Sequence, residues 1–387
     1  MSGSNTEIPR RLKLQAVGMV LLHVLLGIPW AIHVATAEGM AAAGFWITGF
    51  LSAVAVSGSV LLFSLNENGT ADTERCTVRR IRPDLGIANT LTMTRSYAVS
   101  VLFATALIPV RSELLIWAPF FLYTLSITID FFDGFVARVT DRSSKLGETL
   151  EHEFDSIGLI SATLLAAARG SLSWWFMLPA LYRYIFMYAY WRRESQGLPV
   201  TEPDNGGAGR VIAGLYWGFI ATSLIPVFPV QLLHLGAPFF VVPLTGAFLR
   251  DWYIVTGRLV PGSGIYKLLA HILRVYIFGW IPLVARITSA VLIGSLAPSI
   301  GGAPSIILYI AVAGLTLGAF ARTNSILAIA VLSFALVYRD IGEAGLVQIV
   351  VALNCLIIMV GSGRFSLARH EDIPFASRIG GRVEAHS

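Results

Sequence analysis

Residues 130–155 read DFFDGFVARVTDRSSKLGETLEHEFD, and this stretch decides the fold. Asp130 and Asp133 are three positions apart, which places them on one face of a helix. Glu151 and Asp155 are four positions apart and share a face of a second helix in the same way. The stretch therefore predicts two neighbouring helices that present four carboxylates to each other.

The sequence on both sides of this stretch is apolar enough to cross a membrane many times. Of the 387 residues, 55% are hydrophobic and 13% are charged, whereas soluble domains carry about 25% charged residues. A bilayer core of about 30 Å needs about 20 apolar residues per helix, and such stretches recur from Leu14 almost to the C-terminus. We therefore predict an all-α polytopic membrane protein with about twelve transmembrane helices. Spans are expected at residues 14–37, 43–65, 88–110, 114–138, 147–168, 172–191, 210–230, 235–257, 270–297, 304–321, 323–338 and 345–361.

The distribution of Lys and Arg predicts which ends of these helices face the cytoplasm. Most of these residues fall in the loops at 66–87, 138–147, 192–210 and 258–268. Cytoplasmic loops of membrane proteins are rich in Lys and Arg, so we expect a multi-pass protein of the inner cell membrane with its carboxylate pairs at the cytoplasmic side. The net charge of +5 has the same origin, and no nucleic-acid partner is expected.

A cluster of Gly, Pro and Ser at residues 257–264 separates two groups of helices and marks a domain boundary. The upstream spans contain several ionisable residues, whereas the downstream spans are nearly free of carboxylates, so the chemistry is expected upstream. The first half of the ninth span, around Arg274, fits a helix lying in the membrane interface as well as a spanning one.

The carboxylate pairs predict a site for divalent metal. A carboxylate near the bilayer centre costs about 2.5–3.5 kcal/mol, and several together repel one another unless a cation lies between them. Oxygen ligands select hard cations such as Mg²⁺, Mn²⁺ or Ca²⁺, and two divalent ions would neutralise the cluster. The alternative, a set of helix-end charges at the membrane surface, explains one Asp pair better than it explains the pattern across both helices.

Small residues on the same helix faces predict room for an extended ligand beside the metal. Gly134 and Ala137 follow Asp133 at helical spacing, and Gly147 precedes Glu151 by one turn. Their lack of side-chain bulk lets a ligand approach the backbone, and Arg138 is placed to pair with a phosphate. Together these residues predict a diphosphate site.

This pattern resembles the signature of the integral-membrane CDP-alcohol phosphatidyltransferases, D-x2-D-G-x2-A-R followed by G-x3-D-x3-D. Every position matches except Glu151, where the family has an aspartate, and the longer side chain moves the carboxylate outward by about one carbon–carbon bond. Residues 89–95 read NTLTMTR and are similar to the N-x-x-T-x-x-R of the family's first core helix. The resemblance covers about residues 80–257 and implies a six-helix catalytic core.

The resemblance also implies a role for each matching residue. Asp130, Asp133 and Glu151 would hold one Mg²⁺ or Mn²⁺, and Asp130, Glu151 and Asp155 a second. Asp155 would also act as the catalytic base that deprotonates a hydroxyl acceptor. The residues expected to bind the CDP part of the donor are Asn89, Thr92, Gly134, Ala137, Arg138, Ser144 and Gly147.

Three further arginines are candidates for binding the acceptor. Arg183 lies inside an expected span, where an arginine must face a cavity or a partner. Arg193 and Arg210 flank a polar loop and would attract an anionic acceptor, although the positive-inside rule explains them equally well.

The segments outside the expected core carry weaker signals. Residues 75–82 (RCTVRRIR) predict a basic amphipathic stretch on the anionic cytoplasmic leaflet, or a purely topogenic one. In the last four spans, residues 314–322 and 361–367 are similar to motifs of the four-helix DoxX-type membrane module, although small residues at helix interfaces also produce such patterns. We expect N-terminal helices and a basic linker over 1–79, the catalytic core over 80–257, and the DoxX-like module with a cytoplasmic tail over 258–387.

The expected function is that of an enzyme of phospholipid biosynthesis. By the resemblance, it transfers a substituted phosphate, phosphatidyl above all, from a CDP-alcohol such as CDP-diacylglycerol to a hydroxyl acceptor and releases CMP. A catalytically weakened homologue that serves as a membrane binding or assembly subunit is the alternative, with Glu151 as the lesion. Cation transport is disfavoured because a permeation path needs access from both faces of the membrane. The partners are membrane lipid, donor and acceptor, and a homodimer stays open.

Overall fold

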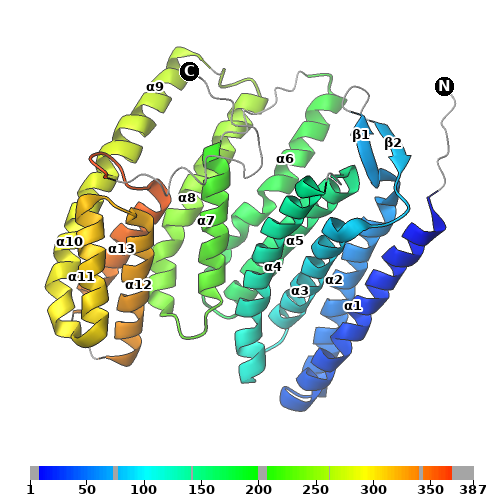
Figure 1. Cartoon of the computed structure of the whole chain (residues 1–387), viewed down its shortest axis with the longest axis horizontal. Coiled ribbons are helices and arrows are strands. Elements are labelled where there is room, and N and C mark those ends of the chain that lie inside the picture. Colours follow the sequence, from blue (N-terminus) through cyan, green and yellow to red (C-terminus); the bar gives the residue numbers. More distant parts are fainter. Residues whose placement is uncertain are drawn as a thin grey trace. The chain divides into compact units, whose positions relative to one another are not determined.

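The computed structural model of the chain describes residues 8–72, 77–140, 143–198, 207–260, 262–339 and 343–367. Helices dominate these residues (Figure 1), which confirms the predicted all-α polytopic class. The chain divides into two compact units, Met1–Gly170 with Leu224–Pro226, and Ser171–Ser223 with Val227–Ser387. The main division, after Gly170, falls inside the expected catalytic core, so the predicted domain bounds remain predictions.

The first unit contains five long helices and a small hairpin (Figure 1, blue to green). Its elements are α1 (Arg10–Ala37), α2 (Met40–Phe63), the short 3₁₀ turn η1 (Leu65–Glu67), β1 (Gly69–Asp72), β2 (Thr77–Ile81), α3 (Gly86–Ala106), α4 (Glu113–Val139) and α5 (Lys145–Ala168). Helix α3 packs against α2, α4 and α5, so it forms the centre of the unit. Each helix coincides within a few residues with an expected span.

The basic segment before α3 contributes the second strand of a β-hairpin, and its expected position on the membrane surface remains a prediction. Strands β1 and β2 pair antiparallel, with Gly69 opposite Ile81 and Asp72 opposite Thr77. The strand pairing was not predicted from the sequence, because the two strands are too short for an alternating pattern to be recognised. Residues 75 and 76, the first two of the basic segment, lie outside the described part of the chain.

The N-terminal helices pack directly on the elements that carry the signature. A buried cluster joins Leu12 of α1 and Leu61 of α2 to Met93 of α3 and Phe154 of α5. The backbone N–H of Leu85, just before α3, donates to the Gln15 side chain of α1 at 2.9 Å. Helices in a membrane associate through van der Waals packing of this kind, so α1 and α2 support the start of α3 and α5.

The second unit contains η2 (Trp174–Met177), α6 (Leu178–Ser195), α7 (Gly207–Ser223), α8 (Val230–Val255), α9 (Gly264–Ile272), the π-helical segment η3 (Leu273–Trp280), α10 (Ile281–Ile300), α11 (Gly302–Leu317), α12 (Ala321–Tyr338) and α13 (Ala344–Val360). Helices α10 to α13 pack as consecutive neighbours, and α13 closes the group by packing against α10. Helix α13 also packs against α8, so the expected C-terminal module is continuous with the helices before it.

The two motifs singled out in the C-terminal module lie together. The backbone N–H of Leu367 donates to the carbonyl of Leu317 at 3.2 Å, and the Ser366 hydroxyl donates to the carbonyl of Gly318. The side chain of Arg286 in α10 is fully buried beneath them. These contacts explain the small residues of the two motifs by packing, and the similarity to DoxX-type modules remains a prediction.

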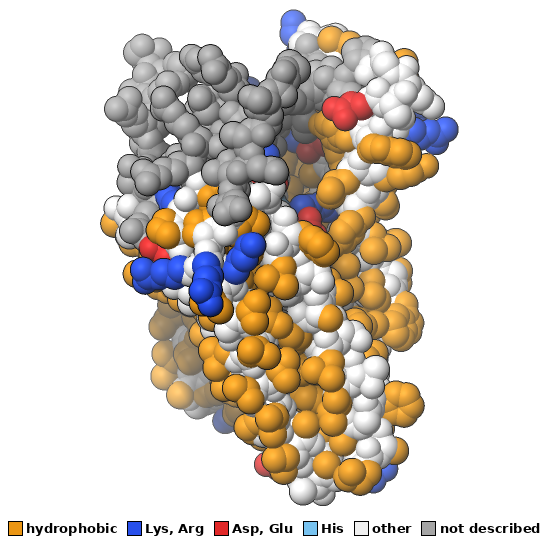
Figure 2. Space-filling view, turned by 90° about the vertical axis from the view of Figure 1, so that its right-hand side faces the viewer, with side chains coloured by type: hydrophobic (Ala, Val, Ile, Leu, Met, Phe, Trp, Pro, Cys, Tyr) orange, Lys and Arg blue, Asp and Glu red, His pale blue; other side chains and the backbone are white. Residues whose placement is uncertain are grey.

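Six helical stretches are long and apolar enough to cross a membrane, namely Arg10–Ala37, Met40–Phe63, Glu113–Ala137, Val230–Val255, Gly264–Ile300 and Ala321–Tyr338. Side chains such as Leu21 and Leu25 of α1 are exposed, as expected for a lipid-facing surface. Figure 2 shows hydrophobic side chains down the length of the helices and Lys and Arg side chains gathered mainly toward one end. Helices α3 and α5, with 21 and 24 residues, are outside this set, because both carry many polar side chains.

Candidate active site

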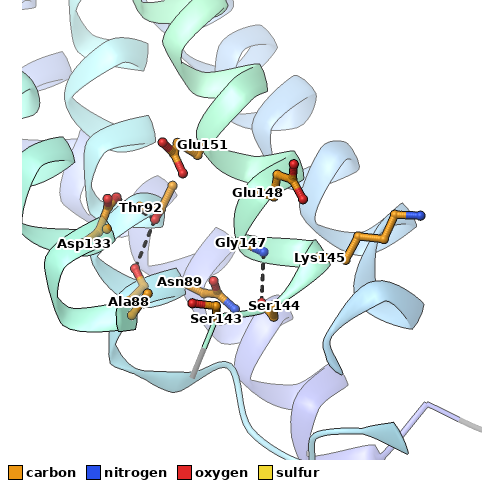
Figure 3. A pocket seen from close by; sticks show the side chains of 12 residues that line it. Ala88, Asn89, Thr92, Asp133, Ser143, Ser144, Lys145, Gly147, Glu148 and Glu151 are labelled. Carbon is orange, nitrogen blue, oxygen red and sulfur yellow. Dashed lines mark hydrogen bonds between the residues drawn. The ribbon is translucent and has the colours of Figure 1, made fainter. Parts of the chain in front are cut away.

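A cavity of about 280 Å³ opens among α3, α4 and α5 of the first unit (Figure 3). It is lined by side chains of all three helices and of the segment that leads into α5. The lining residues are Ala88, Asn89, Thr92, Asp133, Gly134, Ala137, Ser143, Ser144, Lys145, Gly147, Glu148 and Glu151. The cavity therefore collects most of the residues that the sequence pattern had selected.

The floor of the cavity depends on how α5 begins. Ser144 has an extended backbone, and its Oγ accepts a hydrogen bond from the backbone N–H of Gly147 at 3.0 Å, as in a typical N-cap. This cap fixes the first turn of α5 beside α3. A Cβ on Gly147 would lie 2.8 Å from Oδ1 of Asn89, so only glycine permits this approach.

Two side chains of α3 present polar atoms to the same space. The amide nitrogen of Asn89 donates to the carbonyl of Leu85 at 2.9 Å, which fixes the amide plane with its oxygen near Gly147. The Thr92 hydroxyl lies 2.7 Å from Oδ2 of Asp133 and 3.0 Å from the carbonyl of Ala88. Since a hydroxyl has a single proton, it donates to one of these oxygens at a time.

The carboxylates meet around an arginine that belongs to α3. Arg95 is 3% exposed, and its guanidinium donates to Oδ1 of Asp130 in α4 and, at 2.5 Å, to Oδ1 of Asp155 in α5. Oδ2 of Asp133 lies 3.7 Å from the same guanidinium. Arg95 thus joins three of the four predicted carboxylates, and its helix contributes to the site as much as α4 and α5 do.

Glu151 differs from the other three carboxylates. Its side chain is exposed and lines the cavity, and no ion pair joins it to Arg95 in the described part of the chain. Asp133 also lines the cavity, whereas Asp130 and Asp155 do not. The cluster therefore has two carboxylates that face the cavity and two that are bonded to Arg95.

The donor set fits a hard divalent cation, but the side chains do not form a metal cage. Among the described residues, no group of three or more His, Cys, Asp or Glu side chains is arranged to hold a metal ion. In this arrangement the guanidinium of Arg95 bridges the carboxylates of Asp130 in α4 and Asp155 in α5. Four carboxylates and one guanidinium leave a surplus of three negative charges, which favours cations.

The remaining predicted residues either belong to the second unit or have side chains that the structure does not describe. Arg183 and Arg193 are partly buried on α6 in the second unit. The side chains of Arg138 and Arg210 are outside the described part of the chain, although the backbones of both are helical. The acceptor role of these arginines stays a prediction.

The sequence analysis included Arg95 in the matched N-x-x-T-x-x-R motif but gave it no role, and it missed the cavity residues Ser143, Lys145 and Glu148. A signal for Arg95 was available, because it follows Thr92 by three positions on a helix that packs between the others. An arginine inside a membrane helix needs a cavity or a partner, and this is as true of Arg95 as of Arg183. Lys145 and Glu148 carry no comparable signal, since they read as ordinary charges in the first turn of a helix.

Comparison with known proteins shows a family match over the part of the chain that contains the cavity-lining residues. Residues 85–242 match the family model described as CDP-alcohol phosphatidyltransferase. A stretch of 76 residues is 32% identical to proteins named "Putative cardiolipin synthase" from Mycobacterium bovis and Mycobacterium tuberculosis, and it makes up 19% of this chain. The match spans 36% of the length of these relatives. No solved structure matches the chain significantly.

Proposed function

We propose that the protein transfers the substituted phosphate of a CDP-alcohol to a hydroxyl acceptor, with release of CMP, on the premise that residues 85–242 match the CDP-alcohol phosphatidyltransferase family model. The observation that carries the proposal is the lining of one cavity by Asn89 and Thr92 together with Gly134, Gly147 and Glu151. These residues come from three different helices, and their common cavity supports one shared ligand.

The cavity has the features that a nucleotide diphosphate requires. Asn89 and Thr92 offer polar atoms from α3, and the glycines of α4 and α5 leave backbone within reach of a ligand. Ser144 and Lys145 complete the wall at the start of α5, where the N-terminal end of a helix favours an anion. We assign the CDP part of the donor to this cavity.

Mg²⁺ or Mn²⁺, held by Asp130, Asp133, Glu151 and Asp155, would stabilise negative charge on the diphosphate when bound. Asp155 is the base in this proposal. Its carboxylate accepts the proton of the acceptor hydroxyl, whose oxygen forms a bond to the β-phosphorus of the donor. The bond between that phosphorus and the bridging oxygen breaks, and the bridging oxygen leaves on CMP.

We propose lipid substrates because the unit that holds the cavity contains apolar helices that would span the bilayer. A donor such as CDP-diacylglycerol would keep its acyl chains in the bilayer while its nucleotide reaches the cavity. The name of the mycobacterial relatives favours a phospholipid product. Our candidates for binding an anionic acceptor are Arg183, Arg193 and Arg210. We also propose that the site lies at the cytoplasmic face of the inner membrane.

Release of CMP tests the proposal directly. The purified full-length protein, in detergent or in liposomes with CDP-diacylglycerol and Mn²⁺, is incubated with a panel of hydroxyl acceptors, and CMP and lipid products are measured by mass spectrometry. We expect CMP with at least one acceptor, and none from Asp155→Asn. Binding of Mn²⁺ and CDP without CMP from any acceptor would contradict the proposal and favour the binding or assembly subunit.

A further inference from the structure

Arg95 is as deeply buried as Asp133, the least exposed carboxylate of the candidate site. Its side chain is 4% exposed, compared with 21% for Asp130 and 25% for Asp155. A buried guanidinium needs anionic partners, and those of Arg95 come from two different helices. Removal of the arginine would leave the carboxylates of α4 and α5 facing each other with no cation of the protein between them.

The same oxygens are the ones that a divalent ion requires. A carboxylate oxygen that accepts a short hydrogen bond from a guanidinium is not available as a metal ligand on that side, and two cations at one place repel each other. The guanidinium bonds Asp130 and Asp155 directly, whereas Asp133, which is buried 3.7 Å from it, and the exposed Glu151 line the cavity.

We propose that Arg95 is an internal counter-ion that competes with divalent metal for Asp130 and Asp155, so that full metal loading requires the guanidinium to release both carboxylates. The inference rests on the proposed function, since it assumes that the cluster binds Mg²⁺ or Mn²⁺. Arg95 acts here as a positioning residue. It limits metal affinity and holds α3, α4 and α5 together when the cluster is not fully loaded.

The displaced guanidinium has a second anion within the same site. Thr92, one turn before Arg95 on α3, lines the cavity assigned to the CDP part of the donor. Arginine binds phosphate oxygens through two parallel hydrogen bonds, and the donor's diphosphate is the anion available on that side. Metal binding and donor binding are therefore coupled through Arg95, each favouring the state in which the arginine has left the carboxylates.

A purely structural role for Arg95 predicts the opposite sign in a metal-binding experiment. If Arg95 only held the helices in place, its removal would loosen the cluster and weaken metal binding. If it competes with metal, its removal strengthens metal binding because a positive charge is lost beside the ligands. The sign of the change in affinity separates the two roles.

The test is titration of the purified full-length protein with Mn²⁺ alone, followed by electron paramagnetic resonance of free Mn²⁺ and by calorimetry. We expect Arg95→Gln to lower the Kd for Mn²⁺ at least about tenfold. Arg95→Lys keeps the charge but cannot bridge two carboxylates with a planar fork, so a smaller decrease in Kd is expected. This second variant keeps the test decisive if the glutamine variant does not fold.

Arg169 provides a matched control in the same unit. It is also a partly buried arginine that joins α4 and α5, but it donates to the backbone carbonyls of Leu115 and Ile116 at 2.7 and 3.0 Å. Arg169→Gln removes a comparable link without removing a charge from the carboxylate cluster. We expect it to lower the melting temperature and to leave the Kd for Mn²⁺ unchanged.

Addition of CDP tests the coupling. In the wild type, CDP should lower the Kd for Mn²⁺ by a larger factor than in Arg95→Gln. An unchanged or higher Kd in both Arg95 variants, or no Mn²⁺ binding to any of the proteins, would overturn the inference. A wild type that binds Mn²⁺ in competition with Arg95 but releases no CMP with any acceptor would instead refute only the proposed reaction.

Discussion

The hydroxyl of Thr92 in α3 lies 2.7 Å from Oδ2 of Asp133 in α4, and both side chains are buried. This contact links the helix with the expected nucleotide-binding residues to the helix with the first carboxylate pair. Asp133 is also the least exposed of the four carboxylates, so its orientation depends on the few partners it has. Thr92 and Arg95 are those partners on α3.

Replacement of Thr92 by valine should disorient Asp133 while keeping the side-chain shape. The loss of a buried hydrogen bond to a charged group costs about 1.5–3 kcal/mol, so a lower melting temperature in detergent is expected. The Kd for Mn²⁺ should rise several-fold, as measured by titration. Thr92→Ser keeps the hydroxyl and serves as the control, and equal Mn²⁺ affinities of the valine and serine variants would argue against this role.

Replacement of Gly147 by alanine should block the cavity at α5. The added Cβ would lie 2.8 Å from Oδ1 of Asn89, so Asn89 or the first turn of α5 must shift. We expect CDP binding to weaken at least about tenfold, measured by calorimetry, with a small effect on the melting temperature. Gly18→Ala in α1 is the matched control, because nothing lies within 4 Å of its added Cβ. A tenfold loss of CDP affinity in Gly18→Ala would show that the weakening is not specific to Gly147.

Replacement of Glu151 by aspartate restores the residue of the family signature. Glu151 is the exposed, cavity-facing member of the cluster, so the shorter side chain has room to adjust. We expect the rate of CMP release to be retained or increased, whereas Glu151→Gln should reduce it by about a hundredfold or more through loss of a charged ligand. If Glu151→Asp were inactive while the wild type released CMP, the reaction would require the longer side chain of glutamate at this position.

Removal of divalent metal should stop CMP release reversibly. Arg95 offsets one of the four negative charges of the cluster, and divalent metal would offset the rest. Treatment with EDTA is expected to abolish release, and Mg²⁺ or Mn²⁺ should restore it, as followed by chromatography of CMP. Undiminished release in EDTA would exclude the metal from the reaction.

The helices were predictable from the sequence because membrane spans leave a long and simple signal. Each expected span overlaps a helix, and the signature residues Asp133, Gly134, Gly147 and Glu151 share a cavity, as helical spacing indicates. Spacing along one helix, however, says nothing about a third helix that packs against it. The bridging role of Arg95 therefore appeared only once α3 was placed between α4 and α5.

Two other features were beyond the sequence signal for different reasons. The hairpin of β1 and β2 is too short to show a period, and its strands have four and five residues. The division of the chain after Gly170 depends on which helices contact each other, whereas composition changes most clearly near residue 257. Composition reflects exposure to lipid, and helices of both units are exposed to lipid, so composition does not mark the boundary between them.

The hydrogen bond from Leu85 to Gln15 bears on how this protein can be shortened. A fragment that began at the signature domain would leave Leu85 and Met93 without the cover of α1 and α2, and would expose the back of the cavity wall to detergent. Expression trials that trim the chain to its recognisable domain would thus yield an unstable product, even though every residue of the signature is retained.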